Sequence, residues 1–185
     1  MLKAAPERTP LRLAIAALTL ALIAACLADR QSAAERALGV ALLATLGIVT
    51  VTDLEQRRIP NKVIGPSALI AVLLGAALRF DGLPTQLGYG IGIGIGLLAL
   101  ALISGGGLGM GDVKLGALLG LYLGSDAIVA LVIGALASAL FGVAVILHRG
   151  VREGRKTWIA MGPFLAAGGA VAVLAGGSLG PHWAG

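Results

Sequence analysis

The chain has 185 residues, of which 58% are hydrophobic and 12% charged, with a net charge of +5 and a mean hydropathy of +0.97. Soluble domains carry about 25% charged residues, so this composition excludes an ordinary soluble domain and predicts a polytopic membrane protein. The positive charge does not predict nucleic-acid binding, because the basic residues lie in short clusters between apolar segments.

The apolar segments, taken in chain order, predict an all-α bundle of seven membrane-spanning helices in a single integral-membrane domain, residues 1–185. A spanning helix needs about 20 residues. The fifth segment reaches only about 18 Å at 1.5 Å per residue, so its helix either begins inside the membrane or continues past Asp126. The seven segments are Leu13–Ala28, Ala37–Thr52, Val63–Leu78, Leu87–Ile103, Val113–Gly124, Ala127–Leu147 and Trp158–Leu179.

The distribution of basic residues predicts the orientation of these helices. If the N-terminus is cytoplasmic and the sides alternate, eleven of the fourteen Lys and Arg residues fall on the cytoplasmic side. The other three, Arg30, Arg36 and Arg79, fall outside. This bias follows the positive-inside rule, so we expect the N-terminus inside and the C-terminus outside.

The first apolar segment ends in "LIAAC" at Cys26 after three basic residues, which is also the shape of a bacterial lipoprotein cleavage site. We expect instead a first membrane helix with a packed cysteine, because Arg12 would crowd the short apolar segment of a signal peptide. A single cysteine provides neither a disulfide framework nor a Cys-based zinc site within one chain. No metal ion and no organic cofactor are expected.

The stretch "GYGIGIGIG", residues 88–96, has glycine at every second position. An isolated strand cannot satisfy its backbone in lipid, so the stretch predicts a helix. On a helix Gly88, Gly92 and Gly96 share one face, which predicts close helix packing of the small-xxx-small kind. A glycine-rich pore lining is the alternative, but the sequence nearby lacks the residues that usually accompany a pore.

Two aspartates are expected at the cytoplasmic ends of apolar segments. Asp53 closes the second segment, and Asp112 opens the fifth after the glycine-rich stretch "GGGLGMG". A carboxylate at membrane depth is costly and is therefore a candidate functional group. Two neighbouring aspartates tend to share one proton, so one can accept a proton from water while the other donates to a carbonyl. Gly109 and Gly111 would let a substrate backbone approach closely.

The residues alone leave other interpretations open. Asp53 could pair with Arg57 at i+4, and Asp112 could be an ordinary helix N-cap. Two acids could also relay protons or ions in a small membrane transporter. A membrane subunit of a pilus or secretion machine without catalysis is a third possibility.

Three segments resemble the type IV prepilin peptidases, a family of membrane-embedded aspartic proteases. "GMGDVKL", Gly109 to Leu115, resembles the GxGD signature of the family, and "DLEQRRIPN", Asp53 to Asn61, resembles its first-aspartate segment. "MGPFLAAGG", Met161 to Gly169, is similar to its late Gly-Pro-Phe segment. The three segments keep the family order over roughly residues 45–170.

The resemblance implies that Asp53 and Asp112 are the catalytic aspartates and that Gly109 and Gly111 are loop glycines near the site. It implies cleavage of the basic leader of prepilin or pseudopilin precursors at the cytoplasmic face of the bacterial inner membrane, alongside pilus or secretion assembly machinery. Larger family members also N-methylate the new N-terminus and carry an insertion with two CxxC pairs. This sequence has no CxxC pair, so it resembles the compact type of Flp/Tad-like pili, and no methyltransferase activity is expected.

Overall fold

The computed structural model describes residues 8–28, 32–78, 80–105, 107–149 and 160–175. These residues form seven α-helices and one short 3-10 helix, with no β-strand among them, so the expectation of an all-α helix bundle is confirmed. The elements are α1 (Arg8–Ala28), α2 (Ala33–Gln56), α3 (Asn61–Leu78), η1 (Phe80–Gly82), α4 (Leu83–Ile103), α5 (Met110–Leu123), α6 (Asp126–Arg149) and α8 (Gly162–Leu174).

Five helices, α1, α2, α3, α4 and α6, are long and apolar enough to cross a membrane. The remaining two, α5 and α8, have 14 and 13 residues and are shorter than a spanning helix. The fifth predicted segment does not continue past Asp126, because Gly124 ends α5 with a φ of 57° and α6 starts at Asp126. The last predicted segment lies partly outside the described residues.

Local sequence signals define the ends of α2, the helix that carries Asp53. Ser32 accepts a hydrogen bond from Glu35 N–H, and the Glu35 side chain accepts one from Ser32 N–H, which is a complete capping box. At the other end, Arg57 takes a left-handed conformation with a φ of 52°. The chain then turns through Pro60, whose carbonyl oxygen accepts the N–H of Ile64 at the start of α3.

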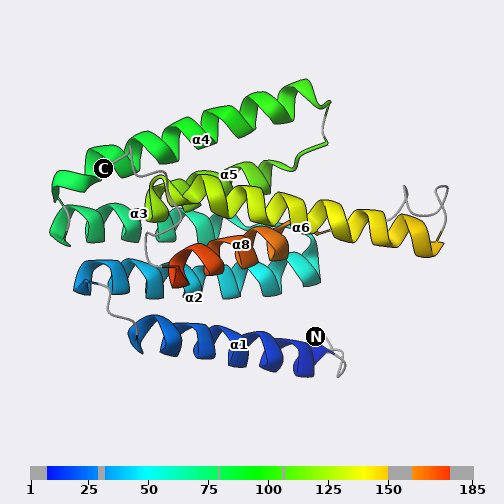
Figure 1. Ribbon diagram of the computed structural model, residues 1–185, viewed down its shortest axis with the longest axis horizontal. Coiled ribbons are helices and arrows are strands. Elements are labelled where there is room, and N and C mark those ends of the chain that lie inside the picture. Colours follow the sequence, from blue (N-terminus) through cyan, green and yellow to red (C-terminus); the bar gives the residue numbers. More distant parts are fainter. Residues whose placement is uncertain (1–7, 29–31, 79, 106, 150–159, 176–185) are drawn as a thin grey trace.

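The short helix α5 lies at the centre of the bundle (Figure 1). It packs against α4, α6, α3 and α8, while α2 packs between α1 on one side and α3 and α8 on the other. Fully buried leucines on α2 and α5 form the core, which explains why α5 is apolar on nearly all of its faces. These are Leu42, Leu43, Leu115, Leu118 and Leu119.

The peripheral helices expose their apolar side chains. Leu13 on α1 is 66% exposed, Leu102 on α4 is 74% exposed and Leu140 on α6 is 70% exposed. Exposed apolar surface on this scale is unusual for a soluble monomer and is what a lipid-facing surface requires. The structure is therefore that of a polytopic membrane protein.

The glycines of α4 pack on a different face from the predicted one. Gly90 lies against Gly120 of α5 so closely that a Cβ on Gly120 would be 2.7 Å from Gly90 Cα, and Gly94 faces Ala117. Gly88, Gly92 and Gly96 have no neighbour within 4 Å of an added Cβ. The expectation that these three form the packed face is wrong; the alternation of glycines allowed either face, and the position of α5 selects the other.

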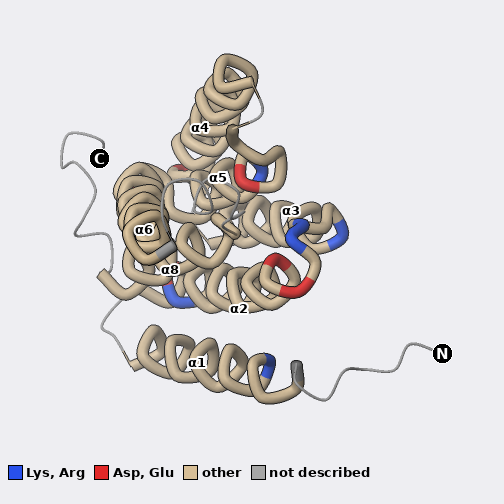
Figure 2. Tube along the Cα trace, turned by 90° about the vertical axis from the view of Figure 1, so that its right-hand side faces the viewer, with Lys and Arg blue, Asp and Glu red and all other residues tan. Residues whose placement is uncertain are grey.

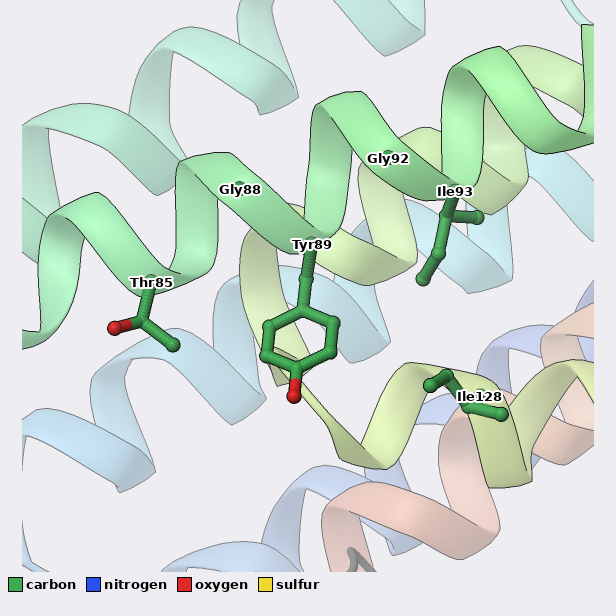
Figure 3. A pocket seen from close by; sticks show the side chains of 6 residues that line it. All are labelled: Thr85, Gly88, Tyr89, Gly92, Ile93 and Ile128. Atoms are coloured by element: carbon green, nitrogen blue, oxygen red, sulfur yellow. The ribbon is translucent and has the colours of Figure 1, made fainter. Parts of the chain in front are cut away.

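The open glycine face borders a hollow of about 490 Å³ between α4 and α6. Figure 3 shows Thr85, Tyr89 and Ile93 projecting from α4 on the side where Ile128 of α6 lies. Its lining contains no acidic or basic residue, so this hollow is separate from the predicted aspartate site.

The α4–α5 crossing predicts opposite effects for two alanine substitutions. Gly120→Ala is expected to destabilise the fold by about 1–3 kcal/mol, because the added methyl would meet backbone atoms that cannot rotate away. Gly92→Ala adds the same methyl to a helix in open space and should be neutral or slightly stabilising. Thermal unfolding of both variants in detergent measures the difference, and equal melting temperatures would contradict this crossing.

Candidate active site

Asp53 lies in the last turn of α2 and is only 7% exposed. Its Oδ2 accepts a hydrogen bond from the backbone N–H of Gly162, the first residue of α8, at 3.0 Å. Arg57 donates its backbone N–H to the Asp53 carbonyl oxygen at 2.8 Å. No ion pair between the Asp53 and Arg57 side chains occurs among the described residues, so the alternative of a simple i+4 pair is not what the structure shows.

The contact between Asp53 and α8 requires glycine at position 162. A Cβ on Gly162 would lie 2.6 Å from Asp53 Oδ2, well inside van der Waals contact. Met161 provides no side-chain cap for α8, and proline follows at position 163. The Asp53 carboxylate, which belongs to α2, therefore caps the N-terminus of α8, where the helix dipole favours a negative charge.

Asp112 lies in the first turn of α5, two positions beyond Met110. The N-cap of α5 is Gly109, with an extended backbone, so the alternative of Asp112 as the N-cap is wrong. The backbone of Gly109 makes a hydrogen bond with the Asp112 carboxylate, and a Cβ on Gly109 would be 3.0 Å from Asp112 Oδ2. A Cβ on Gly111 would be 3.1 Å from Ile59 Cβ, so this glycine lets α5 begin against the α2–α3 loop.

The structure brings Asp53 and Asp112 to the same end of the bundle. Asp112 lies outside the five long apolar helices, and its pKa is raised to about 6, first by burial and second by the negative charge of Asp53. The Gly109 hydrogen bond opposes these effects. Figure 2 looks onto this end and shows acidic and basic positions gathered near the ends of α2, α3 and α5. The two carboxylates therefore interact electrostatically across the α2–α5 contact.

Polar contacts hold the surrounding helix ends together. Lys114 Nζ donates a hydrogen bond to Asn61 Oδ1 at 2.8 Å, which joins α5 to the first turn of α3. Arg12 near the start of α1 makes a two-pronged ion pair with Glu55, in the last turn of α2. Lys114 and Asn61 were not expected to meet, because their separation of 53 residues carries no sequence signal.

Two other described aspartates, Asp81 and Asp126, lie on elements away from this pair. Asp126 is buried at the start of α6, at the opposite end of α5 from Asp112. Asp81 belongs to η1, and Asp29 lies outside the described residues. Within the described part of the chain, no three His, Cys, Asp or Glu side chains lie close enough together to hold a metal ion.

Residue 26, the possible cleavage position, is buried in the described structure. α1 continues from Arg8 to Ala28 without interruption, and Cys26 is fully buried. A Cβ on Gly39 of α2 would lie 2.9 Å from Cys26 Sγ. The structure thus shows Cys26 as a packed residue of the α1–α2 contact.

Comparison with known proteins identifies the family. Residues 40–147 match the model of the type IV leader peptidase family, a range that contains both Asp53 and Asp112. The Prepilin leader peptidase/N-methyltransferase of Aeromonas salmonicida is 32% identical over 147 residues, which cover 75% of this chain and 50% of that protein. The protein of the same name from Aeromonas hydrophila gives the same identity and coverage.

The chain therefore belongs to the type IV leader peptidase family. It spans about half the length of the curated relatives it matches. No solved structure matches it significantly. Gly162, which donates to Asp53, lies beyond the residues that match the family model.

The raised pKa of Asp112 predicts a pH-dependent stability difference. The folded state binds the Asp112 proton more tightly than the unfolded state, in which the carboxyl group has its ordinary pKa of 3.8. The stability of the fold therefore falls as the pH rises toward 6. Asp112→Asn removes this loss. The variant should therefore unfold at a higher temperature than wild type at pH 8, and the advantage should shrink toward pH 4. Thermal unfolding at a series of pH values checks this, with Asp81→Asn as a control; a lower melting temperature for Asp112→Asn at pH 8 would contradict it.

Proposed function

We propose that this chain is a membrane-embedded aspartic endopeptidase. In this proposal it removes the basic leader of prepilin-like precursors at the cytoplasmic face of the bacterial inner membrane. The observation that carries the proposal is the electrostatic coupling of Asp53 and Asp112 at one end of a bundle that belongs to the leader peptidase family. The catalytic roles, the substrate and the orientation are all part of the proposal.

The surroundings of the two carboxylates suggest how they divide the proton. The Gly162 N–H bonded to Asp53 Oδ2 stabilises a negative charge on Asp53. Burial beside that charge raises the pKa of Asp112, which favours a proton there. We assign Asp53 as the base and Asp112 as the acid of the pair, which titrates as a unit.

The proposed reaction is hydrolysis of one peptide bond by one water molecule. Asp53 takes a proton from the water molecule while the water oxygen attacks the carbonyl carbon. At the same time Asp112 donates its proton to the carbonyl oxygen. The tetrahedral intermediate then collapses with cleavage of the C–N bond. Asp53 passes its proton to the leaving amine and Asp112 recovers its proton from the hydroxyl group, so both residues return to their initial states.

The position of the pair suits a substrate whose apolar helix stays in the bilayer. Both aspartates lie at helix ends rather than at mid-helix, so a leader segment at the edge of the apolar layer would reach them. Arg57 and Arg58 at this end are exposed, as cytoplasmic loop residues are under the positive-inside rule. The proposal covers peptidase activity alone, because the sequence holds no CxxC pair, and its partners would be the precursor and the assembly machinery that uses the product.

Conservative replacement of either aspartate tests the proposal. Asp53→Asn and Asp112→Asn keep the shape of the side chain but remove the shared proton, so each alone should abolish cleavage. The assay is co-expression with a precursor that has a basic leader, a glycine and an apolar helix, followed by separation of precursor and mature forms. Asp81→Asn is the matched control and should cleave normally. Normal cleavage by Asp112→Asn would overturn the assignment, and an Asp-dependent proton flux in vesicles without cleavage would indicate a transporter.

Gly162→Ala tests the hydrogen bond that holds Asp53. The added methyl would lie 2.6 Å from Asp53 Oδ2 and must displace the carboxylate from the α8 N-terminus. A displacement of about 1 Å can cost about 100-fold in rate, so cleavage should fall by that order with the protein still folded. Gly65→Ala on α3, where an added methyl meets no atom within 4 Å, is the control. Equal cleavage rates for the two variants would show that this contact does not position the base.

A further inference from the structure

Three buried hydroxyl groups form a hydrogen-bonded chain across the bundle, away from the aspartates. Thr45 on α2, Ser67 on α3 and Tyr122 on α5 are each no more than 8% exposed. Thr45 Oγ1 lies 2.8 Å from Ser67 Oγ, and Ser67 Oγ lies 3.1 Å from Tyr122 Oη. The chain therefore links the helix that carries Asp53, through α3, to the helix that carries Asp112.

Three hydroxyl hydrogens serve the four short contacts of this hydrogen-bonded chain. The Thr45 hydroxyl donates its only hydrogen to the Ala41 carbonyl oxygen at 2.8 Å, so its oxygen must accept from Ser67. Ser67 thereby uses its only hydrogen, which leaves Tyr122 as the donor to Ser67. Tyr122 Oη also lies 2.9 Å from the Ser67 carbonyl oxygen, so its only hydrogen is shared between that oxygen and Ser67 Oγ. Every hydroxyl hydrogen in the chain has an acceptor.

The hydrogen-bonded chain of hydroxyl groups lies where it can control the relative position of α2 and α5. These two helices contact each other at few residues and are both packed against α3 and α8. Thr45 precedes Asp53 by eight residues, and Tyr122 follows Asp112 by ten, which is about 12 Å and about 15 Å of helix. Because helices are stiff along their axes, any slip of α5 along α2 moves Asp112 past Asp53 by the same distance.

Polar groups in apolar surroundings make such a slip costly. Buried leucine and alanine surfaces can pack in several registers, whereas a buried hydroxyl without a partner costs about 1–3 kcal/mol. A slip of α5 would separate the Tyr122 hydroxyl from both of its Ser67 partners. The Lys114–Asn61 hydrogen bond joins the same pair of helices, α5 and α3, nearer to the aspartates.

We propose that Thr45, Ser67 and Tyr122 are positioning residues that set the axial register of α5 against α2, and through it the separation of Asp53 and Asp112. The activity part of this inference rests on the proposed function; the register itself does not. None of the three residues touches the reacting groups in this scheme. They act through the two helices.

The activity test compares variants that remove a hydroxyl group of the Thr45–Ser67–Tyr122 hydrogen-bonded chain with a variant that removes a hydroxyl group outside it. Thr45→Val and Tyr122→Phe should lower kcat about 10- to 100-fold with little change in KM, and should move the limbs of the pH–rate profile, because the coupling of the two aspartates depends on their separation. Thr45→Ser should restore both. Thr50→Val is the matched control: Thr50 is on the same helix, nearer to Asp53, and its hydroxyl donates to Leu46 O at 2.7 Å within its own helix. Unchanged kcat and pH limbs in Thr45→Val and Tyr122→Phe, or an equal effect of Thr50→Val, would overturn the proposal.

A distance measurement without substrate separates this inference from the proposed function. Spin labels on cysteines introduced at Gln56 and Met110, both exposed, in a Cys26→Ala background would report the distance between the ends of α2 and α5. Thr50→Val should keep the wild-type distance distribution, and Thr45→Val with Tyr122→Phe should shift or broaden it. If that double variant does not fold, Tyr122→Phe alone, which removes one oxygen atom, provides the same comparison. An unchanged distribution overturns the inference, whereas a shifted one in a protein that cleaves no precursor supports it and refutes the proposed function.

Discussion

The hydrogen bond from Gly162 N–H to Asp53 Oδ2 is the contact on which the arrangement of this end of the bundle depends. A carboxylate among apolar helices needs a donor, because an unpaired buried charge is very costly. The start of α8 supplies that donor without a side chain. Two features follow from it: position 162 must be glycine, and α8 must begin beside the last turn of α2.

The sequence allowed the fold class to be predicted and the two aspartates to be proposed as a site, because both inferences depend on local composition. Long apolar segments indicate helices whatever their neighbours are, and Asp53 and Asp112 are conspicuous as acids at the ends of such segments. The family assignment followed from three short motifs and is confirmed by the match of residues 40–147. The orientation of the bundle in the membrane stays a prediction from the charge distribution.

The pairings between helices could not be predicted, because they depend on which elements become neighbours. Glycine at every second position of residues 88–96 is compatible with either of two faces, and the packed one proved to contain Gly90 and Gly94. The motif "MGPF" resembles a family segment, but its sequence does not indicate what it contacts. The contact of Gly162 with Asp53 is visible only once α8 lies beside α2. Ser67 and Tyr122 are 55 residues apart, and nothing in the sequence indicates that their hydroxyls meet.

The length of α5 has a consequence for how water reaches the aspartates. A helix of 14 residues is about 21 Å long, whereas the hydrocarbon layer is about 30 Å thick. At least one of its ends must therefore lie below the surface of that layer, together with the irregular backbone that adjoins that end. Such backbone is tolerated at that depth only against protein or in a water-filled recess. If the recess lies at the Asp112 end, the shortness of one helix sets the depth of the two aspartates, and the proposed hydrolysis would take place below the lipid headgroups without a pore through the bilayer.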